Sequence, residues 1–115
     1  MWSVPETLKE IAEAGDGRIV LELIDSFQRD TASRLERLHE ALTRFDADRV
    51  KAEAHSIRGS ARQMGAESLA DLCQAVEASA PQMNWSELEY QAKQAEVRFA
   101  EVRSAMSEYV QATGA

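Results

Sequence analysis

The sequence predicts an all-α fold, namely an antiparallel up-down four-helix bundle with a short additional N-terminal helix. The 115 residues are rich in Ala, Glu, Leu, Arg and Gln, which favour helices, and they include only five Gly and two Pro. Apolar residues recur at intervals of three and four, and no segment alternates as a β-strand does. The length fits a single domain, spanning residues 1–115, with one modest core.

The composition also narrows the possible functions. The formal net charge of −7 opposes binding to nucleic acids and to anionic membrane surfaces. No apolar run is long enough to span a bilayer, and the first residues lack the features of a signal peptide. The single cysteine, Cys73, cannot form an internal disulfide. We therefore expect a cytoplasmic monomer that binds neither nucleic acid nor membranes.

A short first helix is predicted to begin near Ser3 and to end at the glycines of residues 15–17. Ser3 can cap this helix, and Glu6 has the spacing of a capping box. The helix has one small apolar face, formed by Leu8, Ile11 and Ala12. Such a face predicts that the helix packs one side against another apolar surface.

A long second helix is predicted over about residues 18–44, followed by a third that Asp46 can cap and Gly65 can end. The apolar residues of the second helix are interrupted at Thr31 and comprise Val20, Leu23, Phe27, Leu35, Leu38, Leu42 and Phe45. The third helix has one stripe with steps of four and three, namely Val50, Ala54, Ile57, Ala61 and Met64.

Two further helices complete the bundle, separated by a predicted loop over residues 81–84. The apolar stripe of the fourth helix is Leu69, Leu72, Cys73, Val76 and Ala80. Asn84 and Glu87 have the spacing of a capping box at the start of the last helix. The stripe of that helix is Leu88, Ala92, Ala95, Phe99, Val102, Met106 and Val110. Short connections make neighbouring helices antiparallel.

His55 lies on the outer face of the third helix. At 100° per residue, its side chain points roughly 140° away from the centre of the apolar stripe. Gly59 stands one turn later on the same face, where a glycine costs about 1 kcal/mol relative to alanine. The missing side chain suggests that a bulky partner must approach the imidazole closely. Three cations share this face, namely Lys51, Arg58 and Arg62, although Asp48 also lies there.

The residues from Ala54 to Ala66 read AHSIRGSARQMGA. This segment closely resembles the signature of histidine-containing phosphotransfer (HPt) domains: Ala-His, a variable residue, an aliphatic, a basic residue, Gly, two small residues, two variable ones, an aliphatic and Gly. Leu69, Leu72, Cys73 and Glu77 fit the helix that follows in the family. One departure is Arg58, where the family more often has Lys.

The resemblance implies that His55 accepts a phosphoryl group on Nε2. Arg58 would face the phosphoryl group, Gly59 would provide clearance, and Lys51 and Arg62 would add positive charge. Glu77 would bond the other ring nitrogen and so fix the tautomer; Gln74 is a weaker candidate for that role. Leu8 and Ile11 either close the bundle or form a docking patch near His55, and Ile19 and Leu23 share this ambiguity.

By the same resemblance, the partner is a receiver domain of a response regulator, of a hybrid histidine kinase, or of both. The acceptor aspartate and a Mg²⁺ ion would belong to that receiver, so this chain would need no cofactor of its own. No Gly-rich phosphate loop occurs, so we expect a phosphoryl carrier without kinase activity of its own. The alternative is a similar bundle that docks or restrains a partner without carrying phosphate.

Two other patterns in the sequence have simpler explanations than a metal site or a catalytic thiol. Glu36 and His39 match one Glu-x-x-His element of di-iron bundles, but such sites need that element on two helices and two further Glu. His55 has no Glu three residues before it, so we predict no metal site and interpret His39 as a surface residue. Cys73 lies within an apolar stripe and is interpreted as a core residue rather than a nucleophile.

Overall fold

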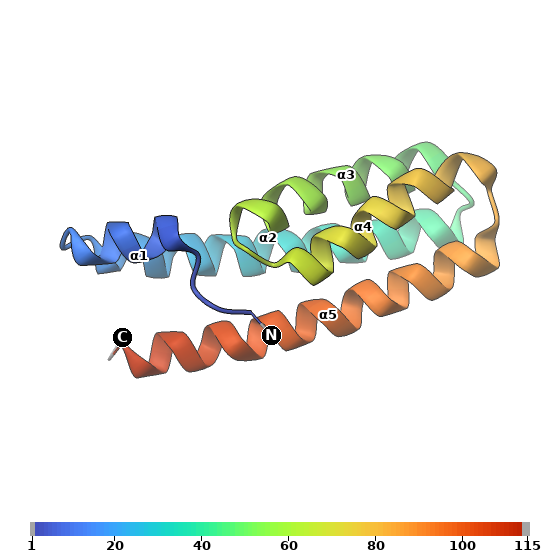
Figure 1. Cartoon of the computed structure of the whole chain (residues 1–115). Coiled ribbons are helices and arrows are strands. Elements are labelled where there is room, and N and C mark those ends of the chain that lie inside the picture. Colours follow the sequence, from blue (N-terminus) through green and yellow to red (C-terminus); the bar gives the residue numbers. More distant parts are fainter. Residues whose placement is uncertain (1, 114–115) are drawn as a thin grey trace.

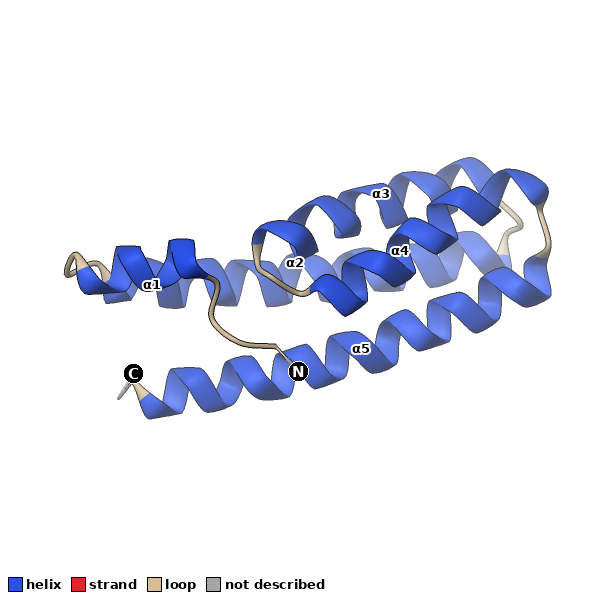
Figure 2. Ribbon diagram, in the orientation of Figure 1, coloured by secondary structure: helices blue, strands red, loops and turns tan. Residues whose placement is uncertain are grey.

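The computed structural model describes residues 2–113 of the chain. Within that range it is all-α, with no strand (Figure 2). None of the described helices is both long enough and apolar enough to cross a bilayer. The elements are α1 (Glu6–Glu13), α2 (Gly17–Thr43), α3 (Ala47–Gln63), α4 (Glu67–Ser79), the 3₁₀ helix η1 (Ala80–Gln82) and α5 (Trp85–Ala112).

Four of the helices enclose a common core. α2 contacts α3 and α5, and α4 also contacts α3 and α5, so the four form a closed cycle of neighbours (Figure 1). α2 and α5 have 27 and 28 residues, whereas α3 has 17 and α4 has 13. The two long helices therefore extend beyond the shorter pair, and α1 packs against α2 at that end.

The predicted stripes of α3, α4 and α5 lie in the core. Val50, Ala54, Ile57 and Ala61 of α3 are completely buried, which fixes the rotation of this helix about its axis. Cys73 is also completely buried, as its position in the stripe of α4 predicted. The sequence periodicity thus predicts the buried residues well in helices that pack against the core on one side and face solvent on the other.

The α2 stripe was predicted incorrectly at two positions. Leu23 is 40% exposed, and the adjacent Ile24 is buried in its place. Phe45 is 66% exposed because α2 ends at Thr43, and Phe45 has a left-handed φ of 55° in the turn that follows. Its ring packs edge-on against Trp85, with ring centroids 5.2 Å apart.

Helix ends follow the predicted caps in three of four cases. The Asp46 carboxylate accepts a hydrogen bond from the Arg49 backbone N–H, and the Asn84 side chain accepts one from Glu87. Gly65 has a φ of +74° just after α3, as a C-terminal glycine should. The predicted Ser3 cap is wrong, because Pro5 occupies the N-cap position of α1 and no side chain caps that helix.

The N-terminal segment crosses the turn between α3 and α4. The Trp2 indole donates a 2.7 Å hydrogen bond to the Met64 carbonyl at the end of α3. A Cβ atom on Gly65 would lie 2.9 Å from Pro5 Cγ, so glycine is required there for close approach as well as for its positive φ. The segment before α1 thereby holds the end of α3 in place.

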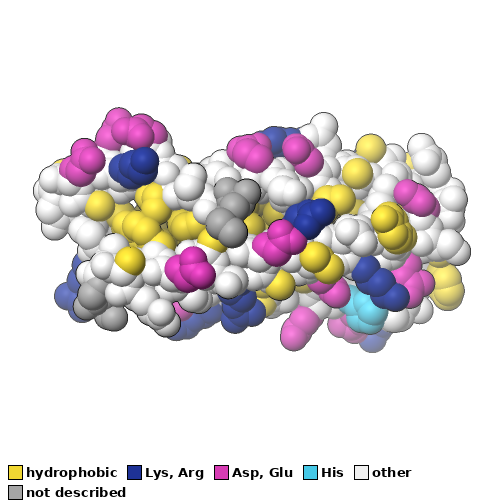
Figure 3. Space-filling view, turned by 60° about the horizontal axis from the view of Figure 1, so that its bottom comes forward, with side chains coloured by type: hydrophobic (Ala, Val, Ile, Leu, Met, Phe, Trp, Pro, Cys, Tyr) yellow, Lys and Arg dark blue, Asp and Glu magenta, His cyan; other side chains and the backbone are white. Residues whose placement is uncertain are grey.

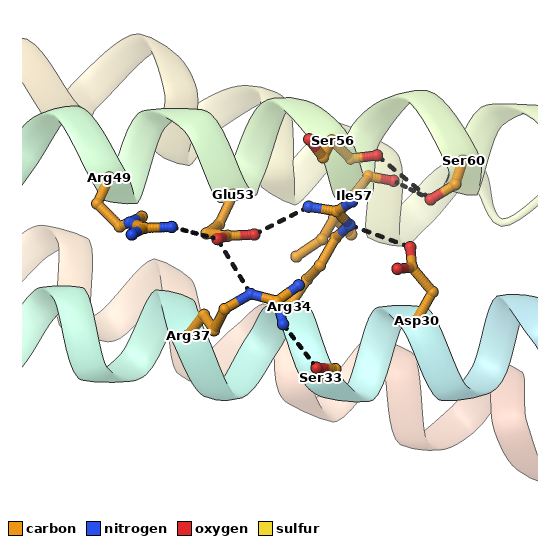
Figure 4. Close-up of polar contacts among 9 residues, drawn as sticks. All are labelled: Asp30, Ser33, Arg34, Arg37, Arg49, Glu53, Ser56, Ile57 and Ser60. Carbon is orange, nitrogen blue, oxygen red and sulfur yellow. Dashed lines mark hydrogen bonds and ion pairs between the residues drawn. The ribbon is translucent and has the colours of Figure 1, made fainter.

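A buried carboxylate joins α2 to α3 (Figure 4). The Glu53 side chain is only 5% exposed and accepts hydrogen bonds from Arg34 at 3.1 Å, Arg37 at 3.2 Å and Arg49 at 3.4 Å. Arg34 is also bound to Asp30, and Arg37 to Ser33. The partly exposed guanidiniums keep contact with water, so the arrangement satisfies the carboxylate without burying three cations.

Replacing Glu53 should therefore destabilise the protein. Glu53→Gln keeps the shape but removes the charge, and we expect the free energy of unfolding to fall by about 2 kcal/mol, as for loss of charge-assisted hydrogen bonds. Arg49→Ala is the matched control, because Arg49 is the most exposed of the three partners and should matter by less than about 1 kcal/mol. Urea denaturation measures both, and equal losses would contradict this account of the cluster.

Candidate functional site

His55 stands in the middle of α3 with its side chain 61% exposed. The buried stripe of α3 occupies the other side of the helix, so packing leaves the imidazole no place in the core. The predicted exposure of His55 is thus confirmed. An exposed imidazole can meet a macromolecular partner directly, and its neutral form is a nucleophile near pH 7.

Glu77 reaches His55 from the neighbouring helix α4. Its Oε1 atom lies 2.9 Å from the His55 Nδ1 atom, and the Glu77 side chain is largely buried. A carboxylate is only an acceptor, so this contact requires a proton on Nδ1. The Nε2 atom then bears the lone pair and is the nucleophilic nitrogen.

Arg58 does not extend freely towards the outer nitrogen of the ring. Its Nη2 atom lies 3.1 Å from His55 Nδ1, and its Nε atom lies 3.2 Å from Glu77 Oε2. No hydrogen bond reaches the buried Oε2 atom, so the second contact is an ion pair without hydrogen-bond geometry. His55, Arg58 and Glu77 therefore form one triangle around the inner nitrogen of the ring.

The cations predicted around His55 are largely neutralised by α4. Arg62 binds Glu67 at 3.1 Å, Gln74 at 2.5 Å and Asp71 at 3.6 Å. Lys51 is exposed and forms no ion pair among the described residues. The expectation of three cations on the His55 face considered α3 alone and therefore missed the carboxylate partners of Arg58 and Arg62 on α4. Glu67, Asp71, Gln74 and Glu77 of α4 recur at intervals of four and three, a spacing in the sequence that could have revealed their shared face.

Gly59 leaves open space beside the imidazole. A Cβ atom built at this position would have no neighbour within 4 Å apart from the helix itself. No packing contact requires glycine here, and the backbone is helical. The conformational cost of this glycine is therefore not explained by the fold, which agrees with the predicted need for clearance.

The apolar residues of α1 pack against the core. Leu8 is 4% exposed and belongs to the core, so a docking role for this residue is corrected to closure of the bundle. Ile11 is partly buried against the same core. α1 lies beyond the end of α3, and apolar side chains reach the surface between α1 and the last turns of α5 (Figure 3). Ile19 and Leu23 are exposed on α2 at this same end.

Other reactive groups do not form a second site. Burial raises the pKa of the Cys73 thiol to about 12, and the Glu77 carboxylate adds to the rise, so this thiol is a poor nucleophile. His39 is exposed on α2, as predicted. Over residues 2–113 there is no cluster of three or more His, Cys, Asp or Glu side chains that could hold a metal ion.

Comparison with known proteins gives a consistent result. The family model described as the Hpt domain matches residues 22–112. The structure is similar to the crystal structure of histidine-containing phosphotransfer protein B (HptB) from Pseudomonas aeruginosa PAO1, with a TM-score of 0.83 and 30% sequence identity. That match covers 94% of each chain. No curated protein matches the chain significantly.

The open space at Gly59 makes a prediction about stability. Gly59→Ala should raise the free energy of unfolding by about 0.5–1 kcal/mol, because alanine restricts the unfolded chain and meets no obstacle in the helix. Gly65→Ala should lower it by about 1 kcal/mol or more, because of the positive φ and the contact with Pro5. Thermal or urea unfolding distinguishes the two; a loss of stability in Gly59→Ala would mean that this glycine serves the fold.

Proposed function

The chain belongs to the Hpt domain family of phosphotransfer proteins, and we propose that it is a phosphorelay intermediate that accepts a phosphoryl group on His55 and exchanges it with an aspartate of a receiver domain. The observation that supports this most is the exposed imidazole whose Nδ1 atom faces the Glu77 carboxylate. That contact favours the tautomer with its lone pair on the outward Nε2 atom, where a partner can reach it.

The transfer is a displacement at phosphorus. The Nε2 lone pair forms the N–P bond while the P–O bond to the aspartate breaks, and the electron pair leaves with the aspartate carboxylate. The Nδ1 proton stays on the ring beside Glu77, whose negative charge stabilises the positive charge that develops there. The Mg²⁺ ion that supports the reaction would belong to the receiver, and the reverse reaction uses the same contacts.

The neighbouring residues take supporting roles in this proposal. Glu77 fixes the ring, and Gly59 leaves room for the receiver. Lys51 is free to approach the phosphoryl group, whereas Arg58 and Arg62 must first leave carboxylate partners on α4. Ile11, at the α1 end, stays a candidate for contact with a partner.

The proposal also covers the topology of the helices, the extent of the domain, its oligomeric state and its location. We infer that α2, α3, α4 and α5 form an antiparallel up-down bundle, which the closed cycle of contacts and the short connections support. We also infer that residues 1–115 make up one domain, since the buried apolar residues form a single cluster. A monomeric state and a cytoplasmic location stay predictions.

The central test compares the two histidines of the chain. Purified protein is incubated with a phosphorylated receiver domain, and acid-labile, base-stable phosphate on the chain is measured. His55→Gln should accept no phosphate, whereas His39→Gln should transfer at the wild-type rate, because His39 lies on α2 outside the site. Circular dichroism should show the same helix content in both variants, since both side chains are exposed.

The outcome also decides between the proposal and its alternative. Persistent transfer in His55→Gln would overturn the proposal. A wild-type protein that binds the receiver tightly but never acquires phosphate would favour the alternative, a module that docks or restrains its partner.

A second test concerns access to His55. Gly59→Leu places a bulky side chain one turn from the imidazole and should slow transfer at least about tenfold, or ~1.4 kcal/mol in the barrier. Gln63→Leu adds the same side chain at an exposed position farther along α3 and serves as the control. Equal rates for Gly59→Leu and the wild type would show that clearance at this position is irrelevant to transfer.

A further inference from the structure

Two charged neighbours contact the same nitrogen of His55, and one requires it to be a hydrogen-bond donor while the other requires it to be an acceptor. Glu77 Oε1 lies 2.9 Å from Nδ1 and can only accept a hydrogen bond. Arg58 Nη2 lies 3.1 Å from Nδ1 and can only donate one. A neutral imidazole carries one proton, so Nδ1 is either a donor to Glu77 or an acceptor from Arg58.

The two options differ in the reactivity of the outer nitrogen. When Nδ1 donates to Glu77, Nε2 has a lone pair and can attack phosphorus. When Nδ1 accepts from Arg58, the proton sits on Nε2, which then has no lone pair to offer. The Glu77 contact thus favours the reactive tautomer, and the Arg58 contact favours the unreactive one.

We propose that Arg58 restrains the unphosphorylated protein by competing with Glu77 for His55 Nδ1, and that an incoming phosphoryl group releases this restraint by drawing the guanidinium away. The restraint is built into the site, because Arg58 is also held by its ion pair with Glu77 Oε2. Arg58 is in this respect a positioning residue. The significance of the two tautomers for transfer rests on the function proposed above.

The phosphoryl group is a stronger partner for Arg58 than the imidazole is. It carries negative charge and several acceptor oxygens, so it can pair with the guanidinium through two hydrogen bonds, whereas the neutral Nδ1 atom offers one lone pair and no charge. Arg58 lies three residues after His55, on the same side of α3, so its long side chain can exchange Nδ1 for a group bound near Nε2. Once Arg58 leaves, Nε2 gives its proton to solvent and Nδ1 takes one up from solvent, since the side chain is exposed; Nδ1 then donates to Glu77 without competition and Nε2 has its lone pair.

The tautomer can be measured without any partner. Nitrogen-15 NMR of the unphosphorylated protein, at a pH of about 9 where an ordinary imidazole is neutral, distinguishes a protonated from an unprotonated Nδ1. We expect both tautomers in the wild type. Arg58→Met, which removes the donor but keeps the chain length, should shift the population towards Nδ1–H. Glu77→Ala should shift it towards Nε2–H.

A matched control isolates the contact from the charge. Arg62→Met removes a cation one turn farther along α3, where it binds Glu67 and Gln74 instead of His55. This variant should keep the wild-type tautomer populations. An unchanged population in Arg58→Met, or the same shift in Arg62→Met, would overturn the proposal. Amide spectra that match the wild type would establish that the variants are folded.

The receiver assay separates this inference from the proposed function. In Arg58→Met, transfer from a phosphorylated receiver should fall, because the guanidinium no longer stabilises the transferring group. If the receiver never phosphorylates the wild type but the tautomer shifts as expected, the proposed function fails while the competition at Nδ1 stands. If the receiver phosphorylates the wild type and the tautomer is insensitive to Arg58, only the restraint is wrong.

Discussion

The rotation of α3 about its own axis is the constraint on which the site depends. Val50, Ala54, Ile57 and Ala61 are completely buried along one side of the helix, and rotation of the helix about its axis would expose them. Glu53 also holds α3 against α2, because its buried carboxylate forms ion pairs with two arginines of α2 and with Arg49 of α3. With α3 in this orientation, the His55 side chain can only point to solvent. The packing of the core therefore determines the position of the site.

The electrostatics around His55 are local. Arg58 and Arg62 are each matched by carboxylates of α4, and the whole chain has a formal net charge of −7. Such a surface does not attract anions over long distances, because each ion pair has little net charge and salt screens the remaining field beyond about one Debye length, roughly 8 Å at physiological ionic strength. A phosphoryl group gains from these cations only when a docked partner brings it into contact, which agrees with the exchange proposed above.

The sequence was most informative about features that depend on residues close together in the chain. Periodicity predicted the outward direction of His55, and single residues predicted the caps at Asp46 and Asn84. It failed where the outcome depends on distant segments. Phe45 leaves the predicted stripe because the backbone turns before it, and Arg58 and Arg62 are paired because α4 lies beside them. The periodicity of a single helix cannot predict either of these features.

Glu77 could be assigned from the sequence only through a family resemblance, yet the hairpin of α3 and α4 gives a physical reason for its place. The two helices are joined by the short turn at Met64–Ala66, with the left-handed Gly65 at its centre. His55 and Glu77 lie about equally far from this turn in opposite directions, so at 1.5 Å per residue they reach similar heights along the packed pair. The position of the turn therefore helps to decide which α4 residue meets the imidazole. An insertion or deletion in the turn would present a different residue to His55 Nδ1, and the choice of tautomer would change with it.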